Sequence, residues 1–202
     1  MNSMDDAALA ALCQKGNLKA FNRLARRWEG PLFLFIRRMV GNDEDARDAC
    51  QDTFLKAYQN IGRLRDPAKF KAWLHHIALN LCRDRGRAAK HRVAQPYEEG
   101  IREDETAPRY AGRLEATDQA AERSSLAGLL GEVLGRLPEE QRTAILLREY
   151  QGFTTAEIAE ITGVPPATVR TRIFYGMKGL RRYLGQRGFS DATLGAEGQA
   201  TS

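Results

Sequence analysis

The sequence predicts an all-α protein built from two small helical domains that a flexible acidic linker joins. Apolar residues recur at helical spacing through residues 5–90 and again from residue 125. The first of these stretches shows no strand-like alternation of apolar and polar residues. Residues 92–124 hold many acids, two prolines, two glycines and few large apolar side chains, which is typical of a flexible linker.

The predicted first domain, residues 1–91, consists of successive helical segments. An acidic start leads into the first helix, DDAALAALCQKG, which ends at Gly16. A second helix follows over NLKAFNRLARRW, and Pro31 is expected to open or kink the next stretch, which ends near Gly41. The last two helices are DEDARDACQDTFLKAYQNI and FKAWLHHIALNLCRDRGR, each with its apolar residues on one stripe.

The predicted second domain, residues 125–185, carries a helix-turn-helix signature. Thr154 and Glu157 match a capping box, in which each side chain satisfies a backbone N–H at the helix start. Gly163 permits the left-handed conformation that ends a helix, while Pro165 stiffens the turn and Pro166 suits the next first turn. A turn this tight sets the angle between two helices and presents the second one.

The second helix of this pair has two chemically different faces. An apolar stripe runs along one side, with spacings of four, four, three and four: Val169, Ile173, Met177, Leu180 and Leu184. The opposite face carries Thr168, Thr171, Arg172, Tyr175, Lys178 and Arg182. A cationic, hydroxyl-bearing face suits the DNA major groove, where Arg and Lys reach guanine acceptors or phosphates. The alternative is a solvated basic face on a helical hairpin, but the turn chemistry favours DNA contact.

The distribution of charge supports nucleic-acid binding by both domains. The net charge is +5. Residues 1–92 carry a net +8 and residues 125–185 a net +2, whereas residues 93–124 carry a net −4. Two basic blocks around an acidic one fit two DNA-facing modules and a linker that avoids or imitates nucleic acid. The polar tail, residues 186–202, is expected to be disordered.

The first domain has its own cationic side on the helix that starts at Phe70. This side holds Lys71, His75, His76, Arg83 and Arg87, with Asn80 at the seam near Trp73. The loop before it adds Arg63, Arg65 and Lys69. Cations beside aromatic rings and an amide suit single-stranded DNA, whose bases stack or flip. The alternative is that Phe70 and Trp73 are ordinary core residues, as their spacing also allows.

The sequence gives little indication of a metal site or a disulfide bond. The three cysteines are odd in number and form no CxxC pair, and the adjacent His75 and His76 project about 100° apart on a helix. The acids from Asp43 to Asp52 begin a helix, where negative charges interact favourably with the helix dipole. This structural role explains the acids better than a metal-dependent nuclease site does. No metal, cofactor or catalytic residue is predicted. Because the longest apolar runs are too short to span a bilayer and no signal peptide is visible, a cytoplasmic protein is expected.

Together these segments resemble the extracytoplasmic-function (ECF) sigma factors, the compact promoter-specificity subunits of bacterial RNA polymerase. The matching segments are GNLKAFNRL, DARDACQDTFLKAY, FKAWLHHIALNLCRDRGR, and the stretch from LPEEQRTAILL to MKGLRRYL, so the resemblance covers about residues 5–185 except the linker. It implies a protein that binds core polymerase, recognises a two-part promoter, opens DNA without covalent chemistry and is held by an anti-sigma factor.

The resemblance also implies roles for residues. Core polymerase would bind at Asp48, Gln51, Asp52, Phe54 and Lys56. The −10 element would be melted and read by Arg63, Arg65, Lys69, Lys71, Trp73, His76, Asn80, Arg83 and Arg87, with Asn80 helping to hold a flipped base. The −35 element would be read by Thr168, Arg170, Thr171, Arg172, Tyr175, Lys178 and Arg182.

Two positions depart from the family pattern. Similar proteins often carry a basic residue where Tyr175 stands and alanine where Gly176 stands, and a helical glycine costs about 1 kcal/mol relative to alanine. Two other functions stay open: a dimeric helix-turn-helix regulator that binds duplex DNA without polymerase, and a DNA-processing enzyme. The first leaves residues 1–90 unexplained, and the second lacks a catalytic constellation.

Overall fold

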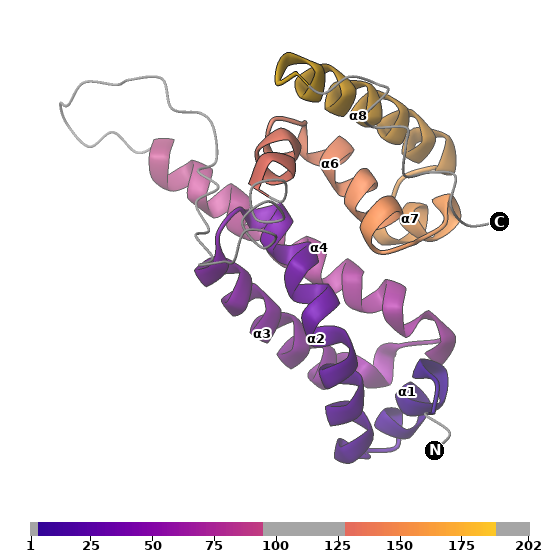
Figure 1. The fold of residues 1–202 in the computed structure, drawn as a ribbon. Coiled ribbons are helices and arrows are strands. Elements are labelled where there is room, and N and C mark those ends of the chain that lie inside the picture. Colours follow the sequence, from indigo (N-terminus) through magenta and orange to yellow (C-terminus); the bar gives the residue numbers. More distant parts are fainter. Residues whose placement is uncertain (1–3, 95–127, 189–202) are drawn as a thin grey trace, which may run out of the picture.

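A computed structural model describes residues 4–94 and 128–188, and every regular element in these two stretches is a helix. The predicted all-α class is therefore confirmed. The N-terminal part comprises α1 (Asp6–Gln14), α2 (Leu18–Val40), α3 (Asp43–Asn60), two short 3₁₀ turns η1 (Ile61–Arg63) and η2 (Pro67–Lys69), and α4 (Phe70–Ala94). Helices α2, α3 and α4 lie along one another, and α1 lies across one end of this group (Figure 1).

Short polar side chains begin the first three helices. Asp5, Asn17 and Asn42 have extended backbones, and each accepts a hydrogen bond from a backbone N–H of the first turn. Gly41 ends α2 with φ of 94°, a left-handed conformation that glycine adopts without a Cβ clash. Each of these caps acts on backbone groups within a few residues of it.

Pro31 does not divide the chain into two helices, although the sequence analysis expected it to open or kink a new stretch. One helix, α2, runs from Leu18 through Pro31 to Val40. Leu32, Phe35 and Ile36, directly after the proline, are buried. Their burial against α3 and α4 offsets the helical hydrogen bond that a proline cannot donate.

The C-terminal part holds a helical stretch at residues 128–135, then α6 (Glu139–Ile145), the π-helical turn η3 (Leu146–Tyr150), α7 (Thr155–Thr162) and α8 (Pro166–Gln186). Two glycines of α8 lie close to α6 and to Leu137, which precedes α6. A Cβ added at Gly176 would lie 2.6 Å from Ile145 Cδ1, and one at Gly179 would lie 2.7 Å from Leu137 Cδ2. The glycines therefore leave room for these two side chains.

The two parts share one hydrophobic core. Its buried residues include Phe35 and Phe70 of the first part and Leu146, Phe153 and Ile161 of the second. Helix α4 contacts α7, and α2 contacts both α6 and η3. In Figure 1 α6 and α7 accordingly lie next to the N-terminal helices, and α8 lies on their far side.

Most of the predicted linker, residues 92–124, falls between the two described stretches. Helix α4 continues to Ala94, three residues beyond the expected boundary at 91. The rest of the predicted linker, and the tail beyond residue 188, lie outside the described residues.

Candidate nucleic-acid interface

The helix-turn-helix signature has the geometry that its residues predict. The Thr154 backbone N–H donates to Glu157 Oε2 at 2.8 Å, and the Glu157 N–H donates to Thr154 Oγ1 at 3.3 Å. The bond from the Thr154 backbone lowers the pKa of the Glu157 carboxyl. Gly163 ends α7 with φ of 71°, and Pro166 begins α8. The capping box, the glycine cap and the proline start are all present.

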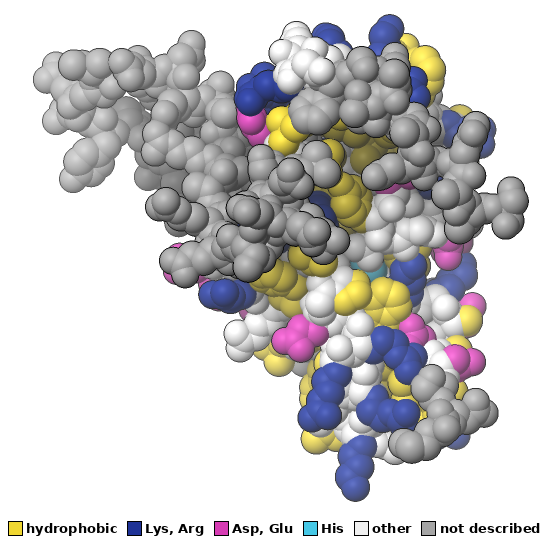
Figure 2. All heavy atoms as spheres, viewed as in Figure 1, with side chains coloured by type: hydrophobic (Ala, Val, Ile, Leu, Met, Phe, Trp, Pro, Cys, Tyr) yellow, Lys and Arg dark blue, Asp and Glu magenta, His cyan; other side chains and the backbone are white. Residues whose placement is uncertain are grey.

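Helix α8 exposes most of the side chains predicted to read duplex DNA. Arg170, Thr171, Tyr175, Lys178 and Arg182 are exposed, whereas Thr168 and Arg172 are half-buried. On the inner side, Val169 and Leu184 are buried and the rest of the apolar stripe is partly covered. Lys and Arg side chains gather at the α8 end of the molecule (Figure 2). The polar and apolar faces of α8 therefore divide as predicted.

A groove beside α8 adds residues that sequence reasoning missed. It encloses about 730 Å³, and its lining includes Arg148 of η3, Thr155 of α7, and Arg170, Phe174 and Arg181 of α8. Arg148 Nη1 lies 3.4 Å from Thr155 Oγ1. Arg170 and Lys178 both line this groove, whereas the other predicted α8 residues do not. The sequence signal for this groove is the hydroxyl pair Thr154–Thr155 at the start of α7, six and seven residues after Arg148.

A second hollow gathers the residues predicted to meet the −10 strand. It encloses about 560 Å³ and is lined by Arg63, Arg65, Lys69, Trp73 and His76, so five of the nine predicted residues meet here. Its far wall is Glu160 and Ile161, both from α7. Lys69 Nζ bonds both Glu160 carboxylate oxygens at 2.8 Å, and this partner raises the pKa of Lys69.

The other predicted −10 residues lie along α4. Asn80 is exposed, and its Nδ2 lies 3.0 Å from His76 Nε2. Arg83 pairs with Glu139 of α6 at 3.4 Å. Arg83 and Arg87 line a polar cleft together with Arg172 of α8, so the structure brings predicted −10 and −35 arginines into one cleft.

Lys71 is enclosed between aromatic rings and the second domain. Its ammonium donates to the Gln151 backbone carbonyl, and lies 4.3 Å from the Phe153 ring centroid and 5.6 Å from that of Trp28. Burial lowers the pKa of Lys71. Cation–π contact and a charged hydrogen bond compensate part of the desolvation.

His75 does not share the cationic side of α4, and the sequence analysis was wrong on this point. It is 0% exposed, and its ring packs on Trp28, Phe35 and Phe153 at centroid distances of 5.9, 5.4 and 4.9 Å. Burial lowers the pKa of His75 to about 4, so the imidazole is neutral at pH 7. One of these rings comes from the second domain, which a helical projection of α4 alone does not include.

The neutral His75 imidazole and the Gln151 amide face each other without a hydrogen between the two nearest atoms. Nδ1 donates to the Lys71 carbonyl at 2.8 Å, which leaves a lone pair on Nε2, 3.1 Å from Gln151 Oε1. Gln151 Nε2 donates to the Pro31 carbonyl at 3.2 Å. Turning the amide to donate to His75 would place its oxygen against Pro31 instead. One acceptor-to-acceptor contact therefore persists in either orientation, which weakens this buried junction.

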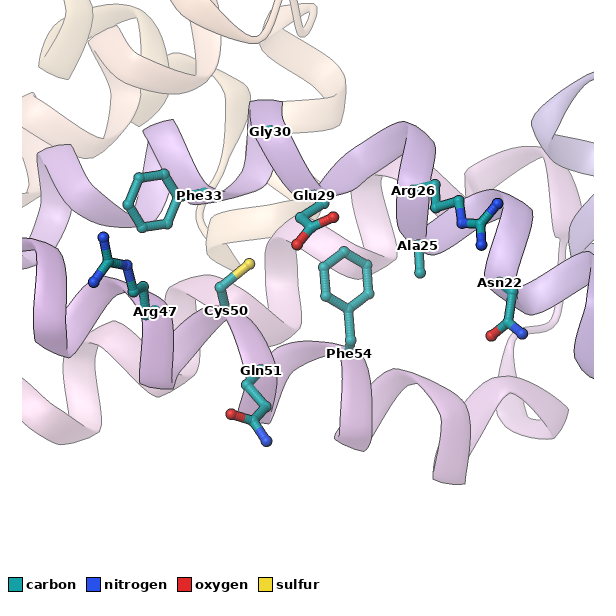
Figure 3. A pocket seen from close by; sticks show the side chains of 10 residues that line it. All are labelled: Asn22, Ala25, Arg26, Glu29, Gly30, Phe33, Arg47, Cys50, Gln51 and Phe54. Atoms are coloured by element: carbon teal, nitrogen blue, oxygen red, sulfur yellow. The ribbon is translucent and has the colours of Figure 1, made fainter.

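The residues predicted to bind polymerase divide between two faces of α3. Gln51 and Phe54 line an open groove of about 900 Å³ between α2 and α3, together with Phe33, Arg26 and Arg47 (Figure 3). Asp52 instead pairs with Arg85 of α4 at 2.8 Å. Asp48 and Lys56 are exposed and lie toward the Asp52 side of α3, since these residues are four positions apart.

The three cysteines lie within the described residues, and none of them is paired in a disulfide. Cys13, Cys50 and Cys82 are free and buried. Burial raises the pKa of Cys50 to about 11 and that of Cys82 to about 12, so both thiols stay protonated and poorly nucleophilic. Within residues 4–94 and 128–188 no three His, Cys, Asp or Glu residues form a metal-binding group. No helix in those ranges is long and apolar enough to cross a membrane.

Fold and surface together define a class: an all-helical, two-domain protein with a helix-turn-helix motif and a second cationic, aromatic surface. Comparison with known families agrees, because the Sigma-70 region 2 model matches residues 24–92 and the Sigma-70 region 4 model matches residues 127–180. The chain belongs to the ECF sigma factors of RNA polymerase, as its curated relatives show.

ECF RNA polymerase sigma factor SigM of Mycobacterium tuberculosis H37Rv is 36% identical over 183 residues, which are 89% of this chain and 85% of SigM. The ECF sigma-E factor of Haemophilus influenzae is 34% identical, covering 85% of this chain and 90% of that protein. Among solved structures, CnrH in complex with the cytosolic domain of CnrY is 28% identical with a TM-score of 0.66, over 90% of this chain and 97% of that one. Sigma factor RpoE of Bartonella quintana, solved with anti-sigma factor NepR, shares the fold at 24% identity and a TM-score of 0.60, over 83% and 98%.

Proposed function

We propose that this ECF sigma factor binds core RNA polymerase, recognises the −35 element with α8, and captures the unpaired −10 strand with α4 and the turns before it. The observation that carries the proposal is the presence of two cationic surfaces of different chemistry on one chain. The exposed face of α8 suits the major groove, whereas the hollow around Trp73 and His76 combines cations with an aromatic ring.

The α2–α3 groove is the proposed site for core polymerase. Phe33 and Phe54 give it apolar surface, Arg47 and Arg26 lie toward its two ends, and Glu29 lies between the two phenylalanines (Figure 3). Apolar side chains bordered by charged ones are common at protein–protein interfaces. Of the five residues that the family resemblance assigns to polymerase, Gln51 and Phe54 are best placed to take part. Asp52 forms an ion pair with Arg85 and so joins α3 to α4.

DNA opening by this protein would need only binding free energy. Unpaired bases stack on aromatic side chains, and neutralised phosphates release counterions, so capture of the single strand shifts the duplex toward the open state. We therefore propose a non-enzymatic role in the cytoplasm. An anti-sigma factor is the proposed regulator, because RpoE, a sigma factor of the same fold, was solved with one.

Run-off transcription tests this function. Bacterial core polymerase, the purified protein and a panel of promoters should give a discrete transcript that requires the protein. Asn80→Ala should reduce promoter opening measured by permanganate reactivity, and Phe54→Ala should weaken co-elution with core polymerase. If the protein neither co-elutes with core polymerase nor supports any transcript, while shifting duplex DNA alone, it would act as a polymerase-independent regulator instead.

A further inference from the structure

A row of cations at the start of α2 lies outside the proposed −10, −35 and polymerase sites. Lys15 follows the last residue of α1, and Lys19 and Arg23 lie four positions apart on one face of α2. All three residues are exposed, and no acid occurs between Lys15 and Trp28. Lys and Arg side chains accordingly gather at the end of the molecule where α2 begins (Figure 2). Lys15, Lys19 and Arg23 are called the α2 cations.

The α2 cations take no visible part in stabilising the fold. Arg27, also on α2, pairs with Asp6 of α1. No carboxylate within residues 4–94 and 128–188 forms an ion pair with any of the α2 cations. A lysine at position 19 is also unfavourable for the helix itself, because it adds positive charge to the positive end of the α2 dipole. Packing and capping therefore do not explain these cations.

The first turns of the helices differ in charge. Helices α1, α3, α6 and α7 each carry an acid in the first turn. Helices α4 and α8, which are proposed to bind DNA, carry none. Helix α2 carries none either, and its second residue is Lys19. The start of α2 thus has the charge pattern of the two helices proposed to bind DNA, and this pattern suits a polyanionic partner.

The α2 cations begin beside the hollow that is predicted to meet the −10 strand. Gln14, directly before Lys15, lies against the turn η1. Its amide donates to the backbone carbonyl of Ile61 at 3.3 Å and also to that of Leu64. These two carbonyls flank Arg63, which lines the hollow. The two hydrogen bonds therefore hold the start of the cationic row next to the cations of the hollow.

We propose that the α2 cations bind the phosphates of the single DNA strand where it leaves this hollow. The inference deepens the proposed function and rests on it for the role of the hollow. Lys19 and Arg23 are about 6 Å apart along the helix axis, which allows them to contact neighbouring phosphates of an extended strand. An acidic surface of polymerase would suit the same charges, but continuity with the hollow favours the strand.

Single-strand binding without polymerase tests the charge contact. The probe is a fluorescein-labelled oligothymidylate, and its anisotropy is measured with the full chain at several salt concentrations. The test variant, Lys19→Gln with Arg23→Gln, removes two cations and nearly preserves helix propensity. The control, Arg136→Gln with Arg187→Gln, removes two exposed cations that pair with Glu132 in the second domain. Each phosphate contact to a single strand contributes about 0.7 to the salt slope, so the test variant should lose about 1.4 and the control none.

Forked promoter DNA, bound by the protein with core polymerase, locates the contact. The unpaired −10 strand is extended by a few nucleotides at either its 5′ or its 3′ end. In the parent protein one of these extensions should tighten binding, and this gain should shrink about sevenfold as salt rises from about 50 to 200 mM. Neutral methylphosphonate linkages in the extension should abolish the gain, and the test variant should not show it.

Three results would overturn the proposal. The first is an equal salt slope in the test and control variants, and the second is no gain from either extension in the parent protein. The third is loss of co-elution with core polymerase in the test variant, because the α2 cations would then contact polymerase. Failure of the proposed function would differ from all three, since the parent protein itself would neither co-elute with polymerase nor support a transcript.

Discussion

His75 of α4 and Gln151 after η3 face each other across the boundary between the two domains, with Nε2 3.1 Å from Oε1 and both side chains buried. The imidazole there is neutral because burial, and secondarily the nearby Lys71 charge, hold its pKa near 4. Domain separation would uncover Nε2 and return the pKa toward its ordinary value of about 6.5. The contact is therefore sensitive to protons.

The first prediction concerns acid. In the closed form the two domains pack together, as they do in this structure. A histidine whose pKa is depressed in the closed form stabilises that form fully above about pH 6.5, and this contribution is lost as pH falls toward 4. If open His75 regains its ordinary pKa, the loss near pH 5 is on the order of 2 kcal/mol. Lys71 is the charged group that acts on His75, and Glu157 and Asp6 in turn act on Lys71. Energy transfer between fluorescent dyes on Gln59→Cys in α3 and Gln186→Cys in α8, two exposed positions, should therefore fall between pH 7 and pH 5.

The matched variant for the acid prediction is His75→Gln, which keeps a polar side chain without a titration in this range. Its energy transfer should stay constant over the same pH interval. An equal pH response in the parent and in His75→Gln would assign the effect to another group.

The second prediction concerns the close approach of α6 and α8. Gly176→Ala would gain helix propensity but would bring Cβ within 2.6 Å of Ile145 Cδ1, in a side chain that is 1% exposed. We expect a net loss of about 1–2 kcal/mol, because overpacking outweighs the propensity gain. Gly185→Ala, in the same helix with no heavy atom within 4 Å of the added Cβ, should instead be stabilising by about 0.5–1 kcal/mol. Urea unfolding measures both; a gain in both variants would contradict the packing account.

The third prediction tests the capping box. Thr154→Ala removes the acceptor for the Glu157 N–H and should lower the free energy of unfolding by about 1 kcal/mol. Thr162→Ala is the control, since its hydroxyl only adds a second bond to the Ile158 carbonyl within α7. Thermal unfolding followed by circular dichroism should separate the two. Equal melting temperatures for the two variants would argue against a stabilising cap.

The fourth prediction separates base reading from phosphate contact on α8. Arg172→Ala should weaken binding of the polymerase complex to its −35 element by about 1–3 kcal/mol and relax the sequence preference there. Arg182, whose guanidinium lies 4.9 Å from the Tyr183 ring, should contribute chiefly through phosphate. Arg182→Ala is expected to weaken all sequences alike and to reduce the salt slope by about one. Promoter binding at several salt concentrations distinguishes them, and identical behaviour of both variants would reject the division.

The turn of the helix-turn-helix motif could be read from the sequence because its determinants act over a few residues. Thr154, Glu157, Gly163 and Pro166 each satisfy or stop a neighbouring backbone group, and all four do so in the structure. The family resemblance expects alanine where Gly176 stands, and here the structure supplies a reason for glycine: Ile145 fills that space.

Long-range contacts could not be read in the same way. A helical projection put His75 among the cations, but Phe153, far along the chain, covers its ring. Asp52, which the family resemblance assigns to polymerase, also pairs with Arg85 of α4, and no sequence pattern indicated that partner. No sequence pattern singles out Arg148, which lies beside Thr155 and α8 only in the folded protein. These side chains acquire their surroundings only when separate helices pack, which periodicity along one helix does not encode.

Three of the bonds that join the domains end on main-chain oxygens, those of Pro31, Gln151 and Ile161. A carbonyl oxygen is the same whatever side chain its residue carries, so most amino-acid replacements at these positions would leave the acceptor in place. The donors that can be lost by replacement include Lys71 and His76, which are also candidates for holding the DNA strand. Mutations that loosen the closed form would thus tend to damage promoter opening as well, and few single replacements could change one property without the other.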